Sequence, residues 1–65
     1  MNMDDQFIGI VELPEGINYV IKRDKYLIAG GMTNVGLIEE HKMKIDPYFS
    51  IDENLQEFVR RMEEK

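Results

Sequence analysis

The chain has 65 residues, 43% of them hydrophobic and 32% charged, with a formal net charge of −5 and no cysteine. A chain of this length forms one domain, and such a domain buries only about 60% of the surface that its unfolded chain exposes. The lack of cysteine excludes a disulfide framework and thiolate zinc sites, so oligomerisation is the remaining way to reinforce a small core.

Charge and hydropathy exclude several functional classes. The 13 acidic and 8 basic residues argue against direct nucleic-acid binding, because nucleic-acid-binding proteins usually present a clustered basic face. The apolar runs are too interrupted to span a membrane. The opening "MNMDDQ" carries two aspartates where a secretory signal carries basic residues. We therefore expect a cytoplasmic protein that binds neither nucleic acid nor membrane.

The sequence predicts a single domain over residues 1–65, with a flexible N-terminus over residues 1–6 and a β-sheet over residues 7–46. "FIGIVEL" at residues 7–13 is rich in β-branched and aromatic residues and ends at the turn signal "PEG". Strict alternation places Phe7, Val11 and Leu13 on one face of this strand and Ile8 and Ile10 on the other. "INYVI" predicts the second strand.

A third strand is predicted from residue 26 to residue 32. "TNVG" at residues 33–36 predicts a turn, because asparagine and glycine tolerate positive φ. "LIEEHKMKI" at residues 37–45 alternates again and predicts a fourth strand, which Pro47 ends because proline cannot donate to a β-ladder.

The C-terminal segment, "SIDENLQEFVRRMEEK", predicts an amphipathic helix over residues 50–64. Ser50 and Glu53 have the spacing of a capping box, in which each side chain binds the other residue's backbone N–H. The helical stripe consists of Ile51, Leu55, Phe58, Val59 and Met62. The predicted fold is therefore a small α+β domain, an antiparallel β-meander of three to four strands with this helix packed on one face.

Two features could belong to a catalytic or ligand-binding site, and we expect neither to do so. "GGMTNVG" has glycines but lacks the lysine and the following helix of a phosphate loop. Gly30 and Gly31 are instead expected to mark a bulge or a close backbone approach. His41, with Glu39 two residues before it, lacks the further histidines or cysteines that a metal site requires. We expect no catalytic residue, no cofactor and no metal.

The strands are apolar on both faces, whereas a single helix covers only one face of a sheet. Six apolar residues were therefore expected to form a face for self-association or for another protein: Ile8, Ile10, Val20, Leu27, Ala29 and Ile38. The favoured hypothesis is a small non-enzymatic interaction module that forms a homodimer, as an accessory or regulatory protein of a bacterium or its phage. One alternative is an acidic inhibitor of a basic, nucleic-acid-binding protein. A second alternative is a small enzyme or ligand-binding protein.

Overall fold

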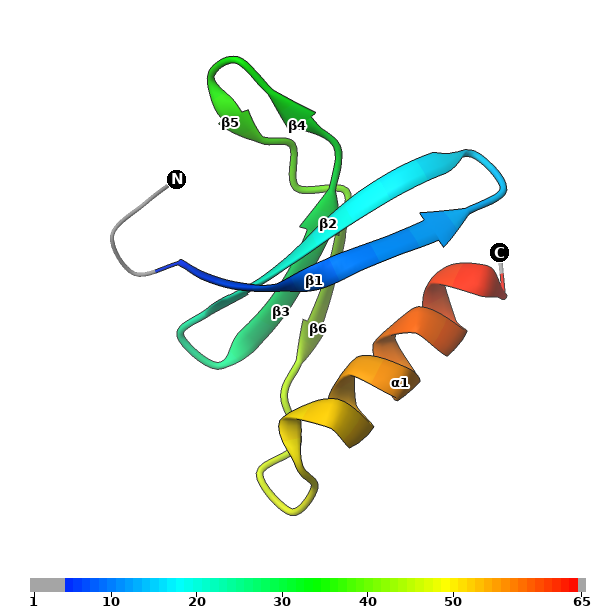
Figure 1. Ribbon diagram of the computed structural model, residues 1–65. Coiled ribbons are helices and arrows are strands. Elements are labelled where there is room, and N and C mark those ends of the chain that lie inside the picture. Colours follow the sequence, from blue (N-terminus) through cyan, green and yellow to red (C-terminus); the bar gives the residue numbers. More distant parts are fainter. Residues whose placement is uncertain (1–4, 65) are drawn as a thin grey trace.

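The computed structural model describes residues 5–64 and confirms the α+β prediction (Figure 1). The main sheet is antiparallel, has the strand order β1-β2-β3-β6, and consists of β1 (Gln6–Leu13), β2 (Gly16–Arg23), β3 (Tyr26–Gly30) and β6 (His41–Lys44). Strands β4 (Met32–Thr33) and β5 (Gly36–Leu37) form a separate hairpin. The helix α1 (Ile51–Glu63) follows β6.

The N-terminus was predicted to be flexible over residues 1–6, of which residues 1–4 lie outside the described residues. Gln6 already begins β1, one residue before the predicted start of the sheet.

A β-bulge in β1 changes the predicted faces of this strand. Phe7 pairs with Ile21 and Gly9 pairs with Val20, so Ile8 is the extra residue without a partner in β2. Because a bulge shifts the alternation by one residue, Ile8 packs against the helix-side core together with Val11, whereas Phe7 and Ile10 lie on the opposite face. The predicted grouping of Phe7 with Val11 is therefore corrected.

The hydrophobic core lies between α1 and one face of the main sheet. Its buried members are Leu13, Val20, Leu27, Ala29, Met43, Phe58 and Met62. The sheet residues among them share one face by register, since Val20 pairs with Ala29 and Leu27 pairs with Met43. The helical stripe predicted from the sequence thus packs on the sheet.

The opposite face of the sheet, which we call the far face, also contains two fully buried residues. Ile21 and Ile28 pair with each other and are 0% and 2% exposed. Phe7 and Lys42, their neighbours across the strands, share this face. Arg23 shares it by alternation and donates hydrogen bonds to Asp5 on β1's N-terminal side. The chain itself therefore covers the centre of the far face with long side chains.

Two predicted strands are interrupted where the chain leaves the main sheet for the hairpin. β3 ends at Gly30, and the residues between β5 and β6 are not in a strand. A Cβ on Gly30 would lie only 1.7 Å from the carbonyl oxygen of Ile38. Gly30 pairs with Tyr19 and so faces the far side of the sheet. The returning backbone thus crosses Gly30 at a distance that only glycine permits, which confirms a close approach at Gly30, whereas a Cβ on Gly31 would meet no atom within 4 Å.

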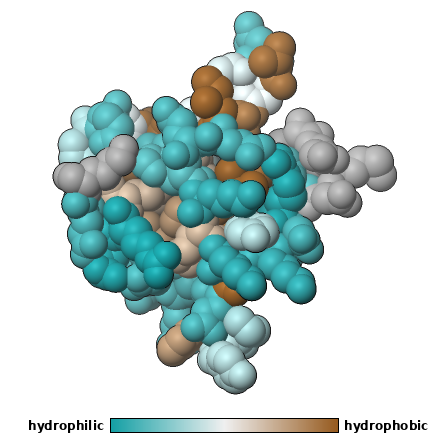
Figure 2. All heavy atoms as spheres, turned by 180° about the vertical axis from the view of Figure 1, so that it is seen from behind, coloured by the Kyte–Doolittle hydropathy of each residue, from teal (hydrophilic) through white to brown (hydrophobic). Residues whose placement is uncertain are grey.

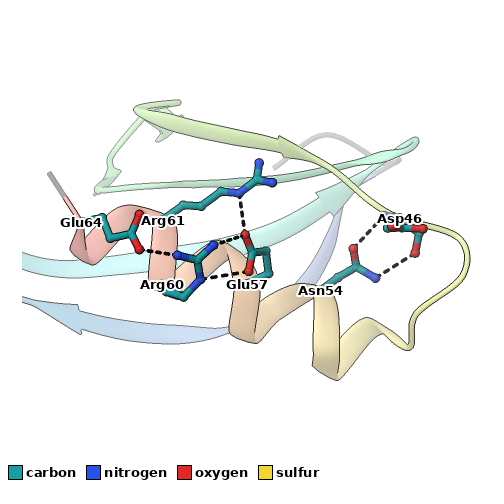
Figure 3. Close-up of polar contacts among 6 residues, drawn as sticks. All are labelled: Asp46, Asn54, Glu57, Arg60, Arg61 and Glu64. Carbon is teal, nitrogen blue, oxygen red and sulfur yellow. Dashed lines mark hydrogen bonds and ion pairs between the residues drawn. The ribbon is translucent and has the colours of Figure 1, made fainter.

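The predicted capping box is present at the start of α1. The Glu53 backbone N–H donates to the Ser50 Oγ at 3.1 Å, and the Ser50 N–H donates to the Glu53 carboxylate at 2.9 Å. One turn later, the buried Asn54 holds the β6–α1 connection against the helix (Figure 3). Its Oδ1 accepts from the Asp46 N–H at 2.7 Å, and its Nδ2 donates to the carbonyl of Asp46 at 3.0 Å. This role of Asn54 was not predicted from the sequence.

Candidate interaction surface

The structure separates the six residues that were predicted to form one partner face. Val20, Leu27 and Ala29 lie in the core beneath α1 and have no exposed surface. Ile8 is partly buried against the same core. Only Ile10 and Ile38 are exposed, and Ile38 lies outside the main sheet. The predicted face is therefore revised. The helix buries half of it, because residues 20, 27 and 29 occupy the alternate strand positions whose side chains point toward the helix.

A smaller apolar surface remains on the far face. Phe7, Ile10 and Ile17 are 50%, 57% and 55% exposed. Ile17 pairs with Glu12 and has the same parity in β2 as Ile21, so the three side chains lie on one side of β1 and β2. We call these three residues the sheet patch. Exposed apolar side chains are common one at a time, but a group on two adjacent strands marks a surface able to bury itself against a partner.

The β4–β5 hairpin carries a second group of exposed apolar residues. Met32, Val35 and Ile38 are exposed, and Val35, in the turn, is 98% exposed. Figure 2, which views the molecule from behind, shows hydrophobic side chains on the hairpin, which stands clear of a mostly hydrophilic surface. The turn is fixed locally, because Gly36 has a φ of 124° and the Thr33 hydroxyl donates to the Gly36 carbonyl at 2.8 Å. The hairpin therefore holds its exposed apolar residues in a defined conformation.

Several acidic residues in the described part of the chain are paired with arginines. On the far face, Arg23 donates to the buried Asp5 carboxylate at 2.6 Å and to Glu39 at 2.5 Å. These hydrogen bonds, first that of Asp5 and then that of Glu39, raise the pKa of the Arg23 guanidinium. Both carboxylates are thereby neutralised locally within the domain.

A second network of paired charges lies on the exposed side of α1 (Figure 3). Glu57 accepts from Arg60 at 2.6 Å and from Arg61 at 2.9 Å, and Arg60 also binds Glu64. Hydrogen bonds from Arg60 and Arg61 lower the pKa of Glu57 from 4.5 to about 2. Carboxylates engaged in this way are less available to attract a basic partner.

The residues considered for catalysis or metal binding are not brought together. His41 lies in β6 and pairs with Ala29, whereas Glu39, its predicted companion, binds Arg23. Within residues 5–64, no group of three or more histidine, aspartate or glutamate side chains has the geometry to hold a metal ion. The expectation that His41 binds no metal stays a prediction.

Besides a hollow of about 250 Å³ that is lined by residues including His41, Phe58 and Met62, two larger open hollows lie beside β6. One, of about 390 Å³, lies between β6 and α1 and is lined by residues that include Met43, Asn54 and Glu57. The other, of about 480 Å³, lies next to the β2–β3 turn and is lined by Lys22, Lys25 and Lys44 among others. In the lining of these three hollows, no described hydrogen bond joins a nucleophile to a general base.

The comparisons with known proteins add no functional information. No protein-family model, no curated protein and no solved structure matches this chain. In the described part of the chain, α1 is neither long enough nor apolar enough to pass through a lipid bilayer. Functional arguments therefore rest on the surface of the domain itself.

Proposed function

We propose that this protein is a small non-enzymatic interaction module that self-associates through the sheet patch, Phe7, Ile10 and Ile17. The observation that carries this proposal is the exposure of all three side chains on adjacent strands of the far face. Burying an isoleucine stabilises an assembly by about 1.5–3 kcal/mol, and a two-fold dimer would bury each patch residue twice. A domain of this size gains from such burial because its own core is small.

The proposal places the protein in the cytoplasm, as an accessory or regulatory protein of bacterial or phage origin. A cytoplasmic location suits a small domain that contains no cysteine. The second candidate, an acidic inhibitor of a basic nucleic-acid-binding protein, is supported less well. Asp5, Glu39 and Glu57 are engaged by arginines of the same chain, which weakens their attraction for a basic partner.

Sedimentation equilibrium at micromolar concentration tests the proposal. The wild-type protein is expected to be a dimer or a larger species, and Ile10→Glu is expected to be a folded monomer. The loss of one buried isoleucine raises Kd by at least about tenfold, and the buried carboxylate raises it further. Leu27→Glu should instead unfold the domain, because Leu27 has no exposed surface.

Val35→Glu is the matched control, since it makes the same kind of change at an exposed apolar residue outside the sheet patch. It should leave the dimer intact. Circular dichroism confirms that each variant is folded before its mass is interpreted. A wild-type protein that stays monomeric at several hundred micromolar would refute self-association. If only Val35→Glu dissociated the dimer, the hairpin rather than the sheet patch would mediate self-association.

A further inference from the structure

The main sheet has two edges that differ in length and chemistry. At one edge, β6 has four residues, and two of them are the exposed lysines Lys42 and Lys44. A short strand that carries lysines is a common way of protecting a sheet edge against pairing with another chain. At the other edge, β1 has eight residues, with five apolar or glycine residues in succession and no lysine or arginine. Only the β6 edge has these protective features.

In the described part of the chain, the backbone groups on the outer side of β1 have no strand partner and are available for a further strand. Within residues 5–64, the backbone hydrogen bonds of β1 are those of its ladder with β2. The bulge at Ile8 lies near the N-terminal end of the strand, and pairing is regular from Gly9 to Leu13. Five regular residues extend for about 17 Å, which is a common length for a strand in a globular protein.

Incompletely buried apolar side chains border the β1 edge on both faces. Phe7 and Ile10 border it on the far face, and Ile8 and Val11 are partly exposed on the helix side. Leu55 and Val59 of the helix are also partly buried against the hydrophobic core. These two residues lie on the flank of α1 away from β6, because Asn54, Glu57 and Arg61 on the opposite flank line the hollow beside β6. Among the strands, β1 makes the most extensive backbone contact with α1.

From these features we infer that a second copy of this chain pairs along β1, with the two β1 strands antiparallel and the two sheets joined into one of eight strands. This inference rests on the proposed self-association and narrows its contact surface to Phe7 and Ile10 of the sheet patch, because Ile17 lies on β2 rather than at the β1 edge. Antiparallel pairing of identical edges requires a two-fold axis perpendicular to the sheet, so both helices lie on the same face of the joined sheet. Leu55 and Val59 of each copy then face the interface on that side, and Phe7 and Ile10 face it on the other.

The surface available is sufficient for such a dimer. A stable interface buries about 800 Å² on each partner, and the chain exposes 4737 Å². The dimer would therefore cover about one sixth of the surface. A self-complementary interface also explains why a second copy fits this edge, since each strand supplies the backbone donors and acceptors that the other requires.

Cysteine scanning tests this geometry, because the chain has no cysteine of its own. Four single variants cover the regular part of the edge: Gly9→Cys, Ile10→Cys, Val11→Cys and Glu12→Cys. At the two-fold axis, a residue lies about 5 Å from its own copy, measured between Cα atoms, and the next residue along lies about 8 Å away. A disulfide requires about 4.4–6.8 Å. Mild oxidation followed by non-reducing electrophoresis should thus give a cross-linked dimer in high yield at one position and at least several-fold less at the adjacent positions.

Lys42→Cys on β6 and Val35→Cys in the hairpin are the controls, and both should cross-link no more than a monomeric reference. Sedimentation of each reduced variant separates the two claims. A dimer that cross-links best at Lys42→Cys, best at Val35→Cys, or equally at all four β1 positions would overturn the β1 geometry and leave self-association standing. Monomers in every case would overturn both.

Discussion

Replacing Asn54 provides a sharp test of how the domain joins its sheet to its helix. Asn54→Ala removes the acceptor of the Asp46 N–H and the donor to three carbonyls, those of Asp46, Phe49 and Ser50. A typical hydrogen bond contributes about 0.5–1.5 kcal/mol, and a buried group left without a partner costs about 1–3 kcal/mol. Because Asn54 is only 3% exposed, water replaces these partners poorly. We expect a loss of about 2–4 kcal/mol in the free energy of unfolding.

Such a loss is a large part of the stability of so small a domain, which at about 0.05–0.15 kcal/mol per residue is about 3–10 kcal/mol. The assay is urea or thermal unfolding followed by circular dichroism, in which a loss of 1 kcal/mol lowers Tm by about 4–8 °C. Asn54→Asp, which has nearly the same shape, should be at least as harmful, because it presents an acceptor to three carbonyl oxygens. Gln56→Ala, at an exposed position of the same helix, is the control. If the free energy of unfolding of Asn54→Ala were within about 0.5 kcal/mol of that of this control, the loop-anchoring role of Asn54 would be refuted.

Three further outcomes are expected. Gly30→Ala should strongly destabilise the domain, because its Cβ would meet the Ile38 carbonyl at 1.7 Å, whereas Gly31→Ala, with no atom within 4 Å, should be tolerated; equal stabilities would contradict the close approach. Ser50→Ala should cost about 1 kcal/mol through loss of the cap, measured by thermal unfolding. The carboxyl of Glu57 should titrate near pH 2 by NMR, and Arg60→Gln should raise that midpoint. Because the pKa of Glu57 is lower in the folded than in the unfolded chain, its pairing stabilises the fold above about pH 4.5 and is lost as the pH falls toward 2.

The helix and its cap could be predicted from the sequence because their determinants are local. Ser50 and Glu53 are three residues apart, and the apolar stripe repeats with the helical period. The close approach at Gly30 was also indicated, since paired glycines in a strand pattern often mark such a place. The partner residue in that contact, Ile38, could not be predicted, because the crossing depends on how far the hairpin turns out of the sheet.

The faces of β1 could not be predicted for a related reason. Alternation assigns each residue to a face only while pairing is regular, and the bulge at Ile8 shifts every residue on one side of it. A bulge is a relation between two strands, so a single strand's sequence does not reveal it. This shift is why Ile8 and Ile10, predicted on one surface, lie on opposite faces. The anchoring role of Asn54 could not be predicted, because a polar residue in a helix ordinarily points to solvent.

The crossing of the chain at Gly30 also separates the hairpin from the rest of the domain, which affects how the sequence of the hairpin can vary. The Ile38 N–H donates to the Gly31 carbonyl at 2.8 Å, so a hydrogen bond joins the two chain segments at the base of the hairpin. Residues 32–37 contribute no member to the buried core. A segment attached in this manner can be exchanged for another of similar span while the body keeps its packing. The same scaffold could thereby acquire new binding specificities through six residues, in the manner of a loop graft, without a new fold.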